Sequence, residues 1–134
     1  MNKKLYFSMS ELIKSDKAIQ YNINNMPDIN SLDCMLDLIV YCLQPIRELI
    51  KKPMIITSGY RNFQVNRLVN GKENSQHTKG QAADFQVRGM SVQQIVNIIE
   101  KSNIEYDQLI NEYNQWVHVS YARGKNRRKT LKIG

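Results

Sequence analysis

A long run of apolar residues at helical spacing constrains the fold of this 134-residue chain more than any other feature. Ser31 is the predicted N-cap of this helix and Asp33 is favourably placed in its first turn. Pro45 lies inside the run and should kink or break the helix. The apolar side chains recur at the three- and four-residue steps of one helix face, so we expect the main core helix here. They are Leu32, Met35, Leu36, Ile39, Val40, Leu43, Ile46, Leu49 and Ile50.

Four short segments with β-branched and apolar residues follow, and each predicts a strand. They cover residues 54–58, 82–87, 107–111 and 116–121, and short helices are predicted over residues 8–17, 63–69 and 91–102. The sequences S-x-x-E and S-x-x-Q open the first and last of these helices as capping boxes. A turn over residues 112–115 joins the last two strands, which must therefore be antiparallel. This order predicts an α+β fold in one domain, 1–134, with a small antiparallel sheet packed with helices.

The net charge of +7 is concentrated at the end of the chain. Residues 121–134 contain six basic residues and no acidic one, so the rest of the chain has a net charge of only +1. A basic tail over about residues 122–134 is either a solvated segment or one attracted to an anionic polymer, nucleic acid or cell wall. Because it lacks interleaved aromatic residues and any recognised module, we do not expect nucleic-acid binding.

Two further patterns bear on the compartment. No run approaches the ~18 to 20 apolar residues of a membrane span, and no apolar segment follows the charged N-terminus as in a secretory signal. We therefore expect synthesis in the cytoplasm without a signal peptide. Cys34 and Cys42 lie eight residues apart on the long predicted helix. They would be roughly 12 Å apart, too far to form a disulfide, which fits a reducing compartment.

Both histidines of the chain and one aspartate form a candidate metal-ligand set. His77 lies in a polar loop, and Asp84 follows seven residues later in the predicted strand 82–87. Side chains alternate between the two faces of a strand. This alternation places Asp84 in the strand 82–87 and His118 in the strand 116–121 on the faces away from the core. Two imidazoles and one carboxylate are a common set for a catalytic zinc, which keeps a fourth position for water. The alternative is a polar loop, an ordinary strand aspartate and a hydrogen-bonded histidine.

A zinc peptidase also needs a base to take a proton from the attacking water. Glu112, six residues before His118, is our candidate, and Glu73 and Asp107 compete with it. The alternative for Glu112 is a solvent-exposed carboxylate in a turn. Arg61 follows a glycine-bearing turn that ends a strand, where a guanidinium can face a carboxylate or a developing oxyanion. Its alternative is a structural salt bridge.

Three motifs together resemble a known family, and they occur in the family's order. They are S-G-Y-R at residues 58–61, S-x-H-x-x-G-x-A-x-D at residues 75–84 and W-V-H-V-S at residues 116–120. The chain resembles the zinc D-alanyl-D-alanine carboxypeptidases over most of its length, particularly the small phage and bacterial peptidase or endolysin type. The fold of that family is shared with the hedgehog signalling domain.

The resemblance implies that His77, Asp84 and His118 bind one zinc ion and that Arg61 binds substrate or stabilises the oxyanion. It also implies cleavage of peptidoglycan stem peptides. Several family members carry a further histidine where this chain has Trp116, and Glu112 resembles the acid that others place before the last ligand. The motif residues expected to contact substrate are Ser58, Tyr60, Ser75, Trp116 and Ser120.

The cleaved bond stays open among a D-Ala-D-Ala carboxypeptidase, an L-Ala-D-Glu endopeptidase and a cross-bridge endopeptidase. We expect a monomer that acts on the cell wall after release by phage lysis, or on muropeptides in the cytoplasm. The basic tail would hold it on the wall, so that deleting residues 124–134 weakens wall binding and spares cleavage of a soluble peptide. The competing class is a non-catalytic zinc-containing module that binds cell wall or belongs to a virion.

Overall fold

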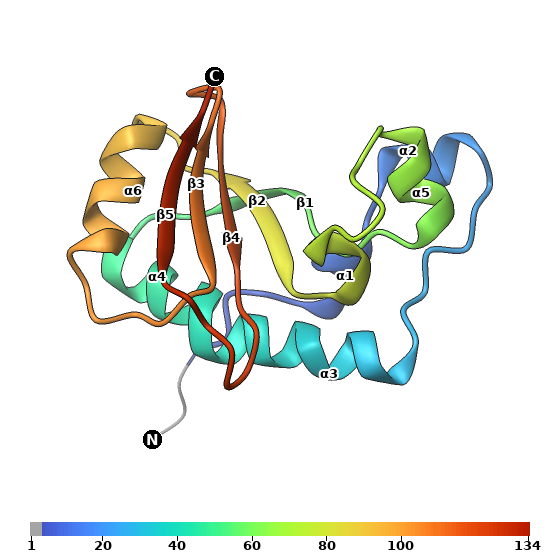
Figure 1. Ribbon diagram of the computed structural model, residues 1–134, viewed down its shortest axis with the longest axis horizontal. Coiled ribbons are helices and arrows are strands. Elements are labelled where there is room, and N and C mark those ends of the chain that lie inside the picture. Colours follow the sequence, from blue (N-terminus) through green and yellow to red (C-terminus); the bar gives the residue numbers. More distant parts are fainter. Residues whose placement is uncertain (1–3) are drawn as a thin grey trace.

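The computed structural model describes residues 4–134, so the charged start at residues 1–3 lies outside the described part. Within this range a five-stranded sheet packs with helices, and the strand order is β1-β2-β4-β3-β5. Figure 1 shows α3 and α4 running below the sheet, with α6 at one end of the molecule and α2 and α5 at the other. The predicted fold class is confirmed. The elements are α1 (Met9–Ile13), α2 (Asp16–Gln20), α3 (Ile29–Leu38), η1 (Ile39–Leu43), α4 (Gln44–Ile50), β1 (Ile55–Ser58), α5 (Phe63–Leu68), η2 (Gln76–Lys79), β2 (Ala82–Gln86), α6 (Val92–Glu100), β3 (Gln108–Glu112), β4 (Trp116–Ser120) and β5 (Lys129–Ile133).

The long core helix begins earlier than predicted and continues through Pro45. Asp28, not Ser31, is the N-cap, because its carboxylate accepts the Ser31 N–H at 2.7 Å. A π-helical turn, η1, separates α3 from α4 immediately before the proline. The wider turn leaves room for the proline ring, which would clash with the preceding turn of a regular α-helix, so the helix changes its hydrogen-bond pattern without breaking.

The continuous helix Ile29–Ile50 is, at 22 residues, long and apolar enough to cross a membrane by length and composition, although it contains charged residues. This is weak support for a membrane span, because the core helix of a soluble protein passes the same test. Its residues Met35, Leu38, Leu43 and Ile46 are fully buried in the hydrophobic core. Cys34 and Cys42 are both free, as their spacing predicted.

The predicted first helix is two helices in the structure. The capping box forms between Ser8 and Glu11, but α1 ends at Ile13 instead of about Lys17. Ser15 then accepts the N–H of Ala18 and caps α2, which was not predicted. The second predicted capping box also forms, between Ser91 and Gln94 at the start of α6.

Alternation along β2 and β4 separates the core face of the sheet from the face that carries the polar residues. Phe85 and Val117 are fully buried and pack with the long helix and α6. Asp84 and His118 are direct cross-strand neighbours in the antiparallel pair β2–β4. They lie on the opposite face, as the alternation predicted, because neighbouring residues along a strand point to opposite faces.

The hairpin before β4 is tighter than predicted. β3 extends through Glu112, which pairs with Trp116 in β4. Tyr113 and Asn114 take φ values of 60° and 56°. Such left-handed residues allow two strands to reverse direction within a short loop. Glu112 is therefore a strand residue with a defined side-chain direction, and the prediction that it belongs to the turn is wrong.

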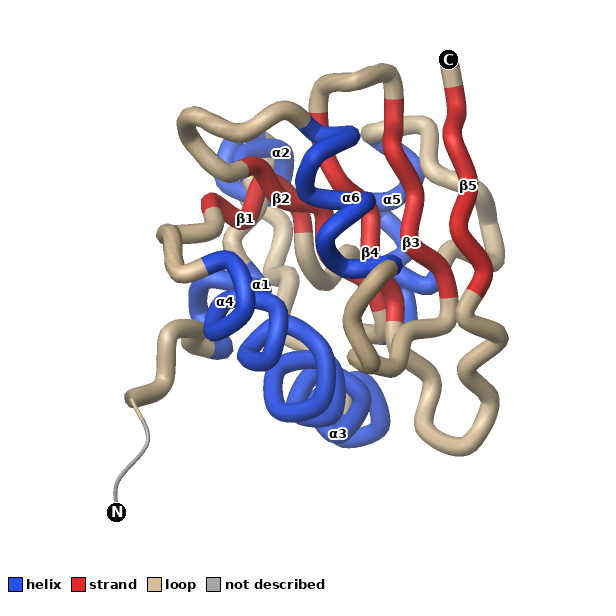
Figure 2. Tube along the Cα trace, turned by 90° about the vertical axis from the view of Figure 1, so that its left-hand side faces the viewer, coloured by secondary structure: helices blue, strands red, loops and turns tan. Residues whose placement is uncertain are grey.

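The C-terminal segment 122–134 is not a solvated tail, because it contains β5. β5 pairs in parallel with β3 from Gln108 opposite Lys129 to Glu112 opposite Ile133, so the sheet is not wholly antiparallel. Figure 2 shows β5 at the outer edge of the sheet beside β3. Before the strand, Arg127 donates three hydrogen bonds to the carboxylate of Asp107, from its backbone N–H, Nε and a terminal nitrogen, at 2.9 to 3.0 Å.

Candidate metal centre

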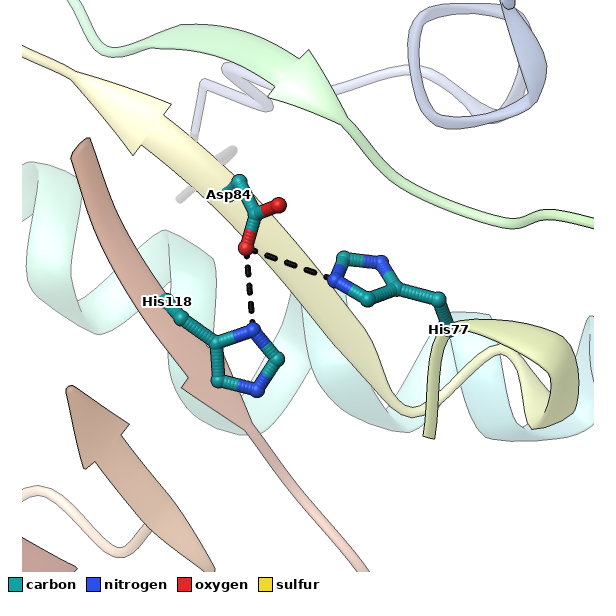
Figure 3. A group of neighbouring side chains, drawn as sticks. All are labelled: His77, Asp84 and His118. Carbon is teal, nitrogen blue, oxygen red and sulfur yellow. Dashed lines mark hydrogen bonds and ion pairs between the residues drawn. The ribbon is translucent and has the colours of Figure 1, made fainter. Parts of the chain in front are cut away.

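Three elements bring the candidate ligands together on the polar face of the sheet. His77 lies in the 3-10 helix η2, Asp84 in β2 and His118 in β4. Each of the three residues is buried, and one potential ligand atom from each lies within 4.8 Å of the others. Figure 3 shows both imidazole rings directed at one carboxylate oxygen of Asp84.

The two imidazoles share the same oxygen of Asp84. His118 Nδ1 is 2.9 Å and His77 Nε2 is 3.3 Å from Asp84 Oδ1. The rings approach edge to face, with 5.1 Å between their centroids. Two nitrogens and one oxygen that converge in this way form one face of a small coordination site.

A backbone carbonyl selects the tautomer of His77. Its Nδ1 lies 2.8 Å from the oxygen of Gly59, which can only accept, so Nδ1 carries the hydrogen. In the neutral ring, Nε2 then presents a lone pair to the Asp84 carboxylate. A cation between His77 Nε2 and Asp84 Oδ1 would be attracted to both atoms. A backbone carbonyl that orients a metal-binding histidine, as that of Gly59 would here, is a common arrangement. The site therefore fits a metal ion, and its mixed nitrogen and oxygen donors suit zinc.

Asp84 is ionised despite its burial. Burial by itself would raise the pKa of this carboxyl group, but the two imidazoles beside its Oδ1, that of His118 above all, outweigh that effect. The pKa of Asp84 consequently lies well below its usual range. An ionised carboxylate beside two imidazoles supplies the negative charge that a divalent cation requires.

Glu112 reaches the same site from β3. Its Oε1 lies 3.6 Å from His118 Nδ1, and its pKa is raised by burial and then by the negative charge of Asp84. Of the two competitors, Glu73 is exposed and Asp107 is held by Arg127. The structure thus places Glu112, and neither competitor, beside the three candidate ligands.

Arg61 is held beside Oδ2 of Asp84, the carboxylate oxygen that the imidazoles do not share. Its Nε donates to Ser58 Oγ at 3.0 Å, one terminal nitrogen donates to Asn66 Oδ1 at 3.3 Å, and the other lies 3.6 Å from Asp84 Oδ2. Burial lowers the pKa of this guanidinium, although the charges of Asp84 and Glu112 oppose the shift. Sequence reasoning missed Asn66, which is buried and orients Arg61, because a polar residue in a short helix carries no motif.

These residues line a cleft of about 760 Å³ on the polar face of the sheet. Ser75 and Trp116 also line this cleft, whereas Ser58 contacts Arg61. Tyr60 and Ser120 do not reach the cleft: Tyr60 belongs to the hydrophobic core, and the fully buried Ser120 accepts the Gln108 N–H. Direct substrate contact by these two residues is therefore not supported, because packing has already occupied their side chains.

A His-Asp-His ligand set beside a carboxylate and an arginine in an open cleft is the arrangement of a metallopeptidase. The chain belongs to the peptidase M15 family: the family model described as Peptidase M15 matches residues 5–120. The segment that carries Arg127 and β5 lies beyond that match. No curated protein matches the chain.

Proposed function

We propose that this protein is a zinc-dependent peptidase that hydrolyses peptidoglycan stem peptides. The observation that carries the proposal is the convergence of His77, Asp84 and His118 in a cleft that Glu112 also lines. The ligand set favours zinc, and membership of the M15 family supports a peptide substrate from the cell wall.

Each residue of the site has a separate task in the proposed reaction. His77, Asp84 and His118 would hold the zinc ion, which when bound acidifies water and polarises a carbonyl group. Glu112 accepts the proton of the attacking water and later returns it to the leaving amine. Arg61 donates hydrogen bonds to the carbonyl oxygen as negative charge develops on it, which its fixed position allows without reorganisation.

The finer specificity is also a proposal. The loops around residues 59–76 and 112–116 supply much of the cleft wall, so they are expected to decide between D-Ala-D-Ala carboxypeptidase and murein endopeptidase activity. We propose an endolysin-like role, in which the protein acts on the wall after release at phage lysis. Processing of muropeptides in the cytoplasm would use the same site.

The test is incubation of the purified protein with peptidoglycan, with and without a chelator, and mass spectrometry of the released fragments. We expect zinc-dependent release of a defined peptide or of single D-Ala. Protein that contains one zinc per chain but releases nothing would favour the non-catalytic wall-binding or virion-associated module instead.

A single substitution tests the role of Glu112. We expect Glu112→Gln to bind zinc as the parent does and to lose about 100-fold or more in turnover, because general-base catalysis contributes roughly that much. Elemental analysis of zinc content checks the retained zinc binding, and mass spectrometry of peptide release checks the loss of turnover. Cleavage by the variant at the parent rate would refute the assignment of the base.

A further inference from the structure

Within residues 4–134, one buried side-chain polar atom lacks a hydrogen-bond partner: Nε1 of Trp116. An indole N–H can only donate, and leaving such a donor unpaired in the interior costs about 1 to 3 kcal/mol. The other buried polar side chains of the described chain have partners, as in the Asp107 and Asn111 networks. The unpaired donor of Trp116 therefore calls for a specific explanation.

The position of Trp116 ties this donor to the metal centre. Trp116 precedes His118 by two residues in β4 and lies directly across from Glu112 in β3. Residues two apart in a strand, and residues opposite each other in a pair, share a face of the sheet. Trp116, Glu112 and His118 accordingly line the same cleft.

Packing alone does not account for an indole at this position. The ring of Tyr113 packs against that of Trp116 at 6.0 Å between centroids, a contact that phenylalanine could also make. The nearest carboxylate along the strand pair, that of Glu112, is directed toward His118 Nδ1 at 3.6 Å. A bound metal ion could not satisfy the N–H either, because it has no lone pair to accept a hydrogen bond. An acceptor oxygen of a molecule bound in the cleft that Trp116 lines would supply the missing partner.

We infer that Trp116 Nε1–H is a substrate-binding donor that takes a backbone carbonyl oxygen of the bound peptide beside the scissile bond. This inference rests on the proposed peptidase function and deepens it. Because Nε1 is enclosed, the indole must turn toward the cleft to make the bond. The bond then forms away from bulk water, where it contributes more than one at the surface.

The chain contains a single tryptophan, so the indole N–H gives one nuclear magnetic resonance signal that reports on this bond alone. The probe is the stem pentapeptide L-Ala-D-Glu-L-Lys-D-Ala-D-Ala, added with zinc to the Glu112→Gln variant to prevent turnover. We expect the indole proton to move downfield with the peptide and not with zinc alone. A peptide that shifts backbone amides of the cleft and leaves the indole signal in place overturns the inference, as does a peptide that shifts nothing.

Kinetics of Trp116→Phe supply the second measurement. The variant keeps the aromatic wall and loses the donor, so we expect KM to rise about tenfold with kcat within twofold, as for a contact made equally in the bound and transition states. Tyr41→Phe is the matched control, because it removes one donor from an exposed aromatic ring outside the cleft. An unchanged KM in Trp116→Phe would contradict the inference. Failure of the zinc-loaded parent to cleave any wall peptide would instead refute the peptidase function.

Discussion

At the scale of single residues, Gly59 joins the packing of the fold to the metal centre. Its carbonyl accepts from His77 Nδ1, while the next residue, Tyr60, donates its N–H to the carbonyl of Leu12 at 2.7 Å. A Cβ at position 59 would lie only 2.3 Å from the Leu12 oxygen, a backbone atom that cannot move away alone. The absence of a side chain thus keeps the carbonyl where it orients His77.

We therefore expect Gly59→Ala to lower the free energy of unfolding by about 1 to 3 kcal/mol, as overpacking does, and to weaken zinc binding by about 10-fold or more. Thermal unfolding and a zinc titration measure the two effects. Gly124→Ala is the control: Gly124 has a left-handed φ of 74° but open space around it, so this variant should lose stability and keep its zinc affinity. Equal zinc affinity in Gly59→Ala and the parent would rule out this role of Gly59.

At the scale of elements, β5 and the loop before it complete the sheet and one end of the cleft. Arg127 and Ile133 line the cleft, and β5 covers the edge of β3 through a parallel ladder. The Asp107 carboxylate links this segment to the metal centre, because it also accepts from Gln76, the neighbour of His77 in η2. The C-terminal segment is therefore part of the architecture of the site.

Deletion of residues 124–134 tests this conclusion. Since β3 would lose its outer partner β5, and Asp107 its arginine, we expect the midpoint of thermal unfolding to fall by at least ~5 °C and the exposed strand edge to promote aggregation. Differential scanning calorimetry and light scattering provide the measurements. From the sequence we expected the deletion to spare cleavage of a soluble peptide. An equal midpoint of thermal unfolding in the truncated chain and the parent would support that expectation and contradict the structural role of β5.

The Arg127–Asp107 pair also predicts a pH dependence of stability. Hydrogen bonds from Arg127 hold the pKa of Asp107 below its usual value, although burial opposes them. A carboxyl group whose pKa is lower in the folded state than its unfolded value of ~3.9 stabilises the fold above about pH 4, and the contribution is lost as the pH falls through the folded-state pKa.

We expect Arg127→Gln to have a lower midpoint of thermal unfolding than the parent near neutral pH. The difference between the two midpoints should shrink as the pH falls from about 5 toward 2. Thermal unfolding at a series of pH values measures it. Lys125→Gln, which removes an exposed charge from the same loop, should follow the parent throughout. A difference that stays constant down to the lowest pH would show that Arg127 acts by packing alone.

At the scale of the whole molecule, the metal centre ties together parts of the chain that are distant in sequence. His77 and His118 are 41 positions apart, and only the folded chain, through η2 and the β2–β4 pair, holds them against Asp84. Ligands that meet only in the folded state make metal binding a contribution to folding stability.

We expect zinc to raise the thermal midpoint of the full chain, and an excess of chelator to reverse the change. At a free zinc concentration 1,000 times Kd the gain is ~4.1 kcal/mol, if the unfolded chain does not bind. Calorimetry with zinc, and with Mg²⁺ as a control cation that prefers six oxygen ligands, measures the effect. A midpoint that does not respond to zinc would argue against a zinc site at these three residues.

The sequence by itself determined the features that depend on local periodicity. Alternation in the strands around Asp84 and His118 predicted the face on which both lie, because neighbouring side chains in a strand point to opposite sides. The capping boxes at Ser8 and Ser91 formed where their patterns predicted them. The motif resemblance indicated the family, and Glu112 was a candidate base before its position was known.

Only the tertiary structure decided which side chains remain available and what each one contacts. Tyr60 and Ser120 have motif positions like those of Ser75 and Trp116, but packing buries them away from the cleft. The carbonyl of Gly59 orients His77, and β5 pairs in parallel with β3, through contacts between residues that are distant in sequence. Such contacts leave no periodic signal in a single sequence, because their geometry depends on how whole elements pack together.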